Sequence, residues 1–317
     1  MIDAYCSQPH YAEHLLPVLA ALPEARRGGL YVHPADRHDS LLRGLPVAFG
    51  YPSTRGTDPV VIAGYQDQMI THRPVVLLSH GAGQTYQGVD MGSYDGGPGR
   101  DVVKLHLCPN ERSAQRNRDR YPHSIAVAVG CPKLDDYARI EGPPIDVVAV
   151  AFHWNCRVVP EAGWAWSTWA GAVEKLARIR PVIGHCHPRA RRELKPWFYD
   201  TGIEYVETVP ELLDRARTLV VDNSSLAYEW AACGRPVVFL DDVLWTNWNH
   251  GLRFGDPLPG PTAGPSGNLA DLQGALARTG RFRTERYMRA VEVYGPLDGH
   301  ASRRAADAIL ETFPCSS

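Results

Sequence analysis

Short runs of Val, Ile and Leu alternate along the chain with longer segments whose apolar residues recur at helical spacing. Continuous apolar runs separated by helices are typical of parallel strands buried on both faces of a sheet. The predicted strands are 29–32, 46–49, 60–63, 75–79, 102–108, 125–129, 145–152, 182–185, 203–206, 219–221 and 237–240. The predicted helices are 10–22, 110–120, 164–178, 189–199, 210–217, 225–233, 268–278, 285–293 and 298–311. The pattern therefore predicts an α/β protein.

This strand–helix series starts twice, on either side of a proline-rich joint, Glu141-Gly142-Pro143-Pro144. We expect two doubly wound, Rossmann-like domains, residues 1–142 and 143–317, in line with a length of 317 residues. Because the joint is short, the domains should face each other across a cleft, and the last helix could pack back on the first domain. A second proline-rich loop, residues 255–267, is expected to cross the surface.

Composition excludes several classes of protein. The chain has 33 Lys and Arg against 35 Asp and Glu, a balance that excludes a globally basic nucleic-acid coat but not local basic patches. No apolar stretch approaches the roughly 18 residues of a membrane-spanning helix. The 7 cysteines are scattered and form no C-x-x-C pair, which indicates a reduced, cytoplasmic protein. A peripheral position at the membrane stays open.

The strongest local feature is the turn Asp222-Asn223-Ser224-Ser225, between a predicted strand and a predicted helix. Ser224 or Ser225 is a natural N-cap, and the turn offers backbone N–H groups and hydroxyls to a phosphate. A capped turn with no ligand is the alternative. In an open α/β sheet, however, ligands bind beyond the carboxyl ends of the strands, where this turn lies.

A second strand ends in His80-Gly81-Ala82-Gly83. A loop histidine beside glycines could act as a base or contact a phosphate. The segment is a weak match to a dinucleotide-binding fingerprint, because Tyr86 occupies the place of the third glycine. It also looks like a hydrolase oxyanion loop, but the chain has no G-x-S-x-G elbow, which sets the hydrolase aside.

A third strand ends in Gly184-His185-Cys186-His187-Pro188. Side chains alternate along a strand, so we expect His187 to contact a phosphate in the cleft and His185 to pack in the core. A zinc pair is a weaker reading, since no further ligand pattern accompanies it. Residues 178–195 hold five Arg and one Lys against Glu193, a local net charge of +5, part of which should be a solvated helix face. Arg112, Arg116 and Arg120 form a smaller stripe that could meet a polyanionic acceptor, with a solvated helix face as the alternative.

Several segments, taken in order, resemble the CDP-glycerol glycerophosphotransferases of teichoic-acid synthesis. The resemblance runs from residue 80 to about residue 310 and rests on the shared order of motifs that are each common. The matching segments are His80-Gly81, Gly130-Cys131-Pro132-Lys133-Leu134-Asp135, His187-Pro188, Asp222-Asn223-Ser224-Ser225, Gly234-Arg235-Pro236-Val237-Val238-Phe239 and Gly299-His300-Ala301-Ser302. The family's alanine-proline-threonine segment with a nearby arginine corresponds to Ala151-Phe152-His153-Trp154-Asn155-Cys156-Arg157, which departs from that pattern. His300 stands where the family usually has lysine.

The resemblance implies a GT-B fold, with a nucleotide-diphosphate donor bound mainly on the second domain and no metal or cofactor required. It implies that His80 is a general base for the acceptor hydroxyl or a phosphate ligand, and that His187 neutralises the diphosphate. Asp222 would orient the turn whose Ser224 and Ser225 meet a donor phosphate. The remaining donor-binding candidates are Gly81, Arg157, Pro188 and Glu229, the last for a ribose or glycerol hydroxyl.

The first functional hypothesis is transfer of a glycerol-phosphate or related group from a CDP-glycerol-like donor to an acceptor hydroxyl. A nucleotide-sugar-dependent glycosyltransferase, acting on a small molecule, a polymer or a modified nucleic-acid base, is the alternative. An NAD-dependent, epimerase-like enzyme that frees the nucleotide by hydrolysis, and a non-catalytic nucleotide- or nucleic-acid-binding protein, also stay open. The nucleotide released distinguishes the enzymes: CMP from phosphoryl transfer and a nucleoside diphosphate from glycosyl transfer.

Overall fold

The computed structural model describes residues 1–64, 67, 71–82, 102–141, 146–155, 164–242 and 258–314. The chain forms two compact units. Unit 1 comprises Met1–Gly83, Asp90–Asp136 and Val293–Ser317, and unit 2 comprises Gln84–Val89 and Tyr137–Glu292. Unit 1 is therefore discontinuous in sequence, because the C-terminal segment belongs with the N-terminal one.

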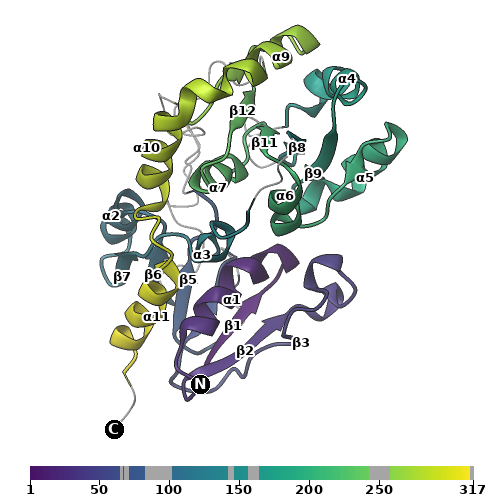
Figure 1. Ribbon diagram of the computed structural model, residues 1–317. Coiled ribbons are helices and arrows are strands. Elements are labelled where there is room, and N and C mark those ends of the chain that lie inside the picture. Colours follow the sequence, from purple (N-terminus) through teal and green to yellow (C-terminus); the bar gives the residue numbers. More distant parts are fainter. Residues whose placement is uncertain are drawn as a thin grey trace. The chain divides into compact units, whose positions relative to one another are not determined.

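Unit 1 is built on a seven-stranded sheet in the order β3-β2-β1-β4-β5-β6-β7, with every pair parallel (Figure 1). Its strands are β1 (Ile2–Cys6), β2 (Arg27–Val32), β3 (Val47–Phe49), β4 (Val60–Ile62), β5 (Val75–Leu78), β6 (Val103–Cys108) and β7 (Ile125–Ala128). Its helices are α1 (Ala12–Ala21), α2 (Glu111–Arg120), α3 (Leu134–Tyr137, at the unit boundary) and α11 (Ala301–Thr312).

The two faces of this sheet have separate cores. Ile2, Ala4 and Cys6 of β1 pack in one cluster with α1 and α11, whereas Tyr5 belongs to the cluster on the opposite face. This alternation is the side-chain period of two that a strand imposes. Ala305 and Ile309 place α11 in the first cluster, so the last helix completes the core of unit 1.

The interior strand β1 is missing from the sequence-based prediction, because Asp3 interrupts its apolar run. Asp3 is accommodated by two partners: its Oδ1 accepts the Gly29 N–H at 3.0 Å, and its Oδ2 forms an ion pair with the buried Arg73. A charge inside a sheet is tolerated when it is paired and hydrogen-bonded in this way. These partners are distant in sequence, so the local pattern did not indicate a strand.

Unit 2 has a six-stranded parallel sheet in the order β10-β9-β8-β11-β12-β13. Its strands are β8 (Val148–Phe152), β9 (Val182–Cys186), β10 (Glu204–Tyr205), β11 (Thr218–Val221), β12 (Val237–Leu240) and β13 (Thr262–Ala263). Its helices are α4 (Trp166–Ala177), α5 (Arg191–Asp200), α6 (Val209–Arg215), α7 (Leu226–Ala232), α9 (Leu269–Arg278) and α10 (Arg283–Tyr294), the last of which returns the chain to unit 1. Aliphatic residues of β8 pack in one core with α4, α5 and α9.

The expectation that residues 255–267 merely cross the surface was wrong for their second half. Thr262 and Ala263 pair with β12 as the edge strand β13, and Ala263 is buried. Gly260 makes this approach possible, since a Cβ there would lie 2.0 Å from the Val237 carbonyl oxygen.

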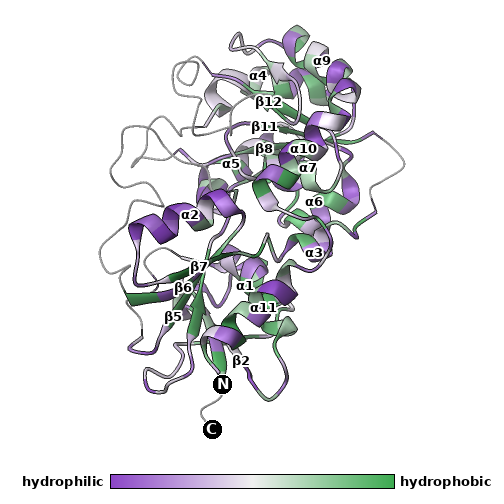
Figure 2. Ribbon diagram, turned by 90° about the vertical axis from the view of Figure 1, so that its left-hand side faces the viewer, coloured by the Kyte–Doolittle hydropathy of each residue, from purple (hydrophilic) through white to green (hydrophobic). Residues whose placement is uncertain are grey.

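Both sheets have the same order, in which the first strand of each unit lies between the second and the fourth. The prediction of two doubly wound, parallel α/β units is therefore confirmed. Figure 2 shows the strands as the hydrophobic elements and α2 as strongly hydrophilic. In the part of the chain that the structure describes, no helix combines the length and apolarity needed to cross a bilayer.

Candidate functional site

In unit 2 the strand order reverses between β8 and β11, and Asp222 follows β11 at this point. Its side chain is fully buried. Oδ1 accepts the His153 N–H at 2.8 Å, and Oδ2 accepts the Ala165 N–H at 3.1 Å, just before α4. Asp222 thus fixes the loop after β8 to the turn after β11, at the place where open α/β sheets bind ligands.

The rest of the turn lies at the start of α7. The Ser224 hydroxyl accepts the Leu226 N–H at 3.2 Å, whereas Ser225, the N-cap residue, makes no side-chain capping bond. Of the two serines that the sequence offered as caps, Ser224 is the one whose hydroxyl is engaged. Glu229, one turn further on, is buried, with 3% of its surface exposed.

His187 follows β9, the strand that pairs with β8. Pro188 opens a short 3-10 turn, η7 (Pro188–Ala190), and the His187 Nδ1 accepts the Arg189 N–H at 3.2 Å. Because Nδ1 accepts, the proton of a neutral His187 ring is on Nε2. His187 is therefore arranged as a hydrogen-bond donor at the carboxyl end of the sheet.

Two further residues beside His187 come from the loop after β8. The His153 ring lies 5.2 Å from the His187 ring, and the Trp154 ring 6.1 Å from it, measured between centroids. The Arg189 guanidinium lies over Trp154 at 4.8 Å. Sequence reasoning missed His153 and Trp154 as site residues, and noticed them only as a departure from the family pattern.

His185 is a core residue, as strand alternation predicts. It is buried, its ring stacks on Tyr205 at an interplanar angle of 11°, and its Nδ1 donates to the Val206 carbonyl at 2.9 Å. The basic run around it is partly neutralised, because Arg191 and Lys195 both pair with Glu207.

In unit 1 the predicted base, His80, follows β5. Its Nδ1 lies 2.6 Å from the Ala63 carbonyl oxygen, which follows β4. A carbonyl only accepts, so Nδ1 carries the proton and the lone pair of the neutral ring is on Nε2. Gly81 then turns the chain with φ = 76°, in the left-handed region that glycine adopts without strain.

The side chains of Tyr11, the residue before α1, and of His14, in the first turn of α1, lie beside the His80 ring. Tyr11 lies 4.7 Å from it and His14 6.2 Å, between centroids. His14 is 6% exposed, and its Nδ1 has no hydrogen-bond partner among the residues that the structure describes. Burial, followed by the charges of Lys133, His80 and His10, lowers the pKa of His14 well below the usual value. The i, i+3 spacing of Tyr11 and His14 after a strand could have indicated this contact, but β1 was not predicted.

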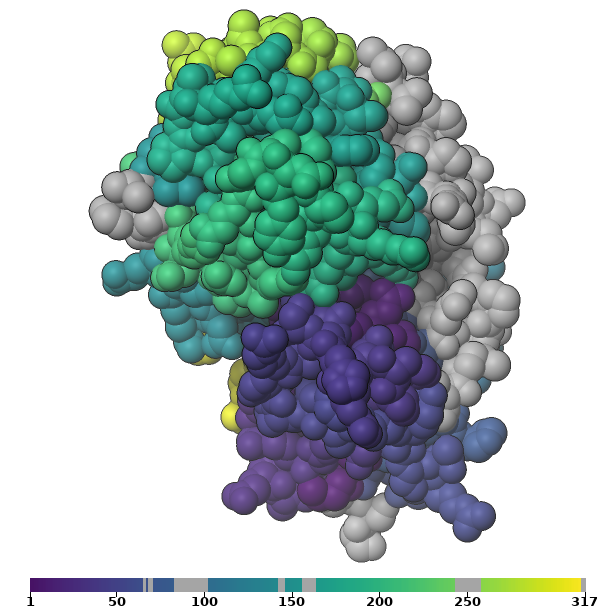
Figure 3. Space-filling view, turned by 90° about the vertical axis from the view of Figure 1, so that its right-hand side faces the viewer, coloured from purple at the N-terminus to yellow at the C-terminus, as the bar shows by residue number. Residues whose placement is uncertain are grey.

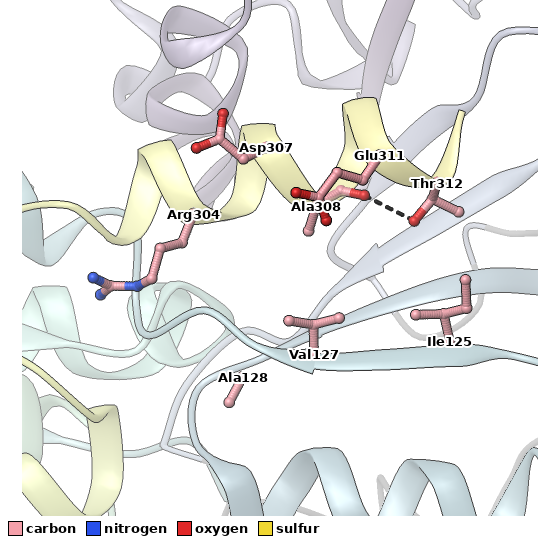
Figure 4. Close-up of a pocket in the computed structure, with 8 residues that line it drawn as sticks. All are labelled: Ile125, Val127, Ala128, Arg304, Asp307, Ala308, Glu311 and Thr312. Carbon is pink, nitrogen blue, oxygen red and sulfur yellow. Dashed lines mark hydrogen bonds between the residues drawn. The ribbon is translucent and has the colours of Figure 1, made fainter. Parts of the chain in front are cut away.

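Arg157 lies outside the described residues, so its position is not assigned. Among the residues that are described, no group of three or more His, Cys, Asp or Glu side chains is placed to hold a metal ion. A pocket of about 400 Å³ lies between β7 and α11 in unit 1. Figure 4 shows Ile125 and Val127 on the strand side of it and Asp307 and Glu311 on the helix. None of the predicted site residues lines it.

Similarity to solved structures covers nearly the whole chain. A protein from Listeria monocytogenes that has been assigned as a UDP-N-acetylglucosamine 2-epimerase aligns over 100% of this chain and 97% of its own, at TM-score 0.63 and 13% identity. The wall teichoic acid polymerase TagF aligns over 98% of this chain and 89% of its own, at TM-score 0.64 and 13% identity. UDP-GlcNAc 2-epimerase from Neisseria meningitidis, solved with UDP-GlcNAc bound, aligns over 98% of both chains, at TM-score 0.57 and 13% identity.

The fold is of the GT-B type. The fold class expected from the sequence is therefore confirmed. At sequence identities this low, structural similarity shows the fold and leaves the reaction open. No protein-family model matches the chain, and no curated protein sequence matches it.

Proposed function

We propose that this GT-B protein is a transferase that moves a glycerol-phosphate or related group from a nucleotide-activated, CDP-glycerol-like donor to an acceptor hydroxyl. The observation that carries the proposal is the opposite hydrogen bonding of two strand-end histidines. His80 donates through Nδ1 to a carbonyl and so presents a basic Nε2, whereas His187 accepts through Nδ1 and so presents an Nε2–H. A base and an anion-binding donor are the two groups that such a transfer needs.

Unit 2 would bind the donor. His187, held by Pro188, would donate to the diphosphate, and Ser224 and Ser225 would contact a donor phosphate with Asp222 fixing the loops around them. Glu229 is the candidate for a ribose or glycerol hydroxyl, and Arg157 and Gly81 remain donor-binding candidates from the sequence alone. The support from relatives is that a TagF structure was determined with CDPG and an epimerase structure with UDP-GlcNAc.

In the proposed step the acceptor oxygen attacks the phosphorus next to the glycerol. The new P–O bond forms as the bond to the cytidine monophosphate breaks, and the hydroxyl proton passes to the His80 Nε2. The charge on the departing CMP would be offset by the His187 Nε2–H and by backbone N–H groups. We propose that the step uses no metal ion and no cofactor.

A nucleotide-sugar glycosyltransferase is the second candidate, favoured by the epimerases among the structural neighbours, one of them bound to UDP-GlcNAc. It would use the same histidines, but the acceptor oxygen would attack the sugar carbon. A nucleoside diphosphate would then leave instead of CMP.

The experiment is a survey of CDP- and UDP-linked donors with identification of the nucleotide released. His80→Ala and His187→Ala should each lower turnover by roughly 10²–10⁴-fold, the effect of losing an acid–base group, and His38→Ala, at an exposed position, is the matched control. Release of CMP supports the first candidate and release of a nucleoside diphosphate the second. Near-normal turnover in His80→Ala would remove the base assignment. Salt-dependent nucleic-acid binding without turnover would replace both candidates with a binding protein.

A further inference from the structure

The two units repeat one structural device that the sequence does not reveal. In unit 1 the Asp67 Oδ2 accepts the N–H of Ser7, the residue after β1, at 3.1 Å. In unit 2 the Asp222 Oδ1 accepts the N–H of His153, the residue after β8, at 2.8 Å. In each unit a carboxylate beyond the fourth strand therefore holds the chain as it leaves the first strand.

A second device is also repeated, at the end of the second strand of each unit. His33-Pro34 follows β2 just as His187-Pro188 follows β9. In both turns the histidine is the N-cap of a 3-10 turn and its Nδ1 accepts the N–H of the residue two positions on, at 3.2 Å. A neutral His33 therefore carries its proton on Nε2, as His187 does.

His33 stands beside an aromatic platform. The Tyr51 ring is stacked on Tyr5, with centroids 5.6 Å apart and planes 24° apart, and Tyr5 is fully buried. His33 meets Tyr51 edge-on, at 5.9 Å and 87°. Tyr51 nevertheless leaves 50% of its surface exposed, and Figure 3 shows the segment of β2 and β3 at the molecular surface. An exposed ring fixed from beneath is a stacking surface for another planar ring.

The polar groups next to the platform match the edge of a heterocycle. His33 offers an N–H, and Asp36, three residues later in the same turn, offers a carboxylate. Burial raises the pKa of the Asp36 carboxyl; the nearby His33 lowers this pKa and the charge of Asp39 raises it further. The turn thus supplies one donor and one acceptor, and the edge of a nucleobase, with its own acceptor and donor, can bind both kinds of group.

We propose that Tyr51, His33 and Asp36 form a binding site in unit 1 for an aromatic heterocycle of the nucleobase class, carried by the acceptor. The identity of the occupant as acceptor rests on the proposed function, whereas the ring site itself does not.

The sheet order sets the size of such an acceptor. His33 follows β2 and His80 follows β5, and β1 and β4 lie between those strands. Three strand spacings of about 4.8 Å separate the two positions by roughly 14 Å. The heterocycle would therefore be a recognition element remote from the reacting hydroxyl, and the acceptor an extended molecule rather than a free nucleoside.

The test observes Tyr51 directly, in the intact protein. Tyrosine is labelled with ¹³C, and the Tyr51 ring resonance is assigned by its loss in Tyr51→Phe. Uridine, cytidine and adenosine, which lack phosphate, are titrated in turn, with methyl glucoside as the comparison. We expect the nucleosides to shift the Tyr51 resonance saturably and the glycoside to leave it in place.

A second measurement tests the hydrogen-bonding edge. His33→Phe keeps a ring against Tyr51 and removes the N–H, so it should weaken nucleoside binding by roughly 2–10-fold, the value of one hydrogen bond. His38→Ala, five residues along the chain, should leave binding unchanged. A Tyr51 resonance that does not move, or that moves equally with methyl glucoside, overturns the heterocycle site. Neither titration uses turnover, so failure of the transferase proposal and failure of the ring site give different results.

Discussion

Asp222 allows the most direct test of how the candidate donor site is built. Its fully buried carboxylate accepts two backbone N–H groups, at 2.8 and 3.1 Å, from two segments distant in sequence. Asp222→Asn keeps the shape of the side chain but replaces one oxygen with an amide that cannot accept. One backbone N–H would then face another donor. Asp222→Ala removes both acceptors.

The magnitude follows from these two bonds. A hydrogen bond to a charged group contributes about 1.5–3 kcal/mol, and a buried donor left unsatisfied costs about 1–3 kcal/mol. We therefore expect Asp222→Asn to lower the free energy of unfolding by about 2–3 kcal/mol and Asp222→Ala by about 3–5 kcal/mol. For a unit of this size, Asp222→Asn should lower the melting temperature by roughly 5–10 °C.

Tryptophan fluorescence is the suitable assay, because all 8 tryptophans of the chain fall within unit 2. The matched control is Asp67→Ala, which removes the equivalent acceptor for the Ser7 N–H in unit 1. It should destabilise unit 1, followed by hydrogen exchange of unit 1 amides, and leave the tryptophan transition in place. If both Asp222 variants kept the wild-type tryptophan transition, the two hydrogen bonds of Asp222 would not contribute to the stability of unit 2.

Three other predictions concern buried positions. The pKa of His14 is lowered in the folded state, so below about pH 6.5 the unfolded chain binds more protons and the free energy of unfolding falls as the pH drops. His14→Phe should remove up to about 1.4 kcal/mol per pH unit of this loss. Urea unfolding followed by circular dichroism measures it. An equal acid sensitivity in both proteins would contradict it. In Gly184→Ala the new Cβ would lie 2.3 Å from Phe198 Cδ1. We expect the free energy of unfolding of unit 2, followed by its tryptophan transition, to fall by about 1–3 kcal/mol. An unchanged midpoint would show that the Phe198 ring moves aside at no cost. The buried Arg235 donates to three backbone carbonyls, so Arg235→Met should cost about 2–4 kcal/mol in the same assay, whereas a neutral result would mean that solvent replaces these bonds.

The strands and helices were largely predictable, because most of them are buried on the face or faces that their apolar pattern implies. The exceptions have physical reasons. β1 was missed because Asp3 depends on Arg73, 70 residues away, for its charge partner. The edge strand β13 was missed because only two residues pair, among prolines that locally indicate a loop.

The candidate site was predictable only in part. Strand-end position pointed to His80, His187 and Asp222, and strand alternation separated His187 from the buried His185. The protonation pattern that gives the two strand-end histidines opposite roles depends on the Ala63 carbonyl and the Arg189 N–H. The Ala63 carbonyl follows a different strand from His80, so the His80 motif does not reveal it. The Arg189 N–H reaches the His187 Nδ1 only because Pro188 opens a 3-10 turn.

The discontinuity of unit 1 has a consequence for how the protein is made. Ala305 and Ile309 of α11 belong to the core that α1 and β1 begin. During synthesis, β1 must therefore wait for α11 before its apolar face is covered, whereas every segment of unit 2 precedes residue 293. The unit encoded first would finish folding last. A nascent chain that stops short of α11 would carry a complete unit 2 beside an uncovered sheet, which chaperones recognise and proteases remove.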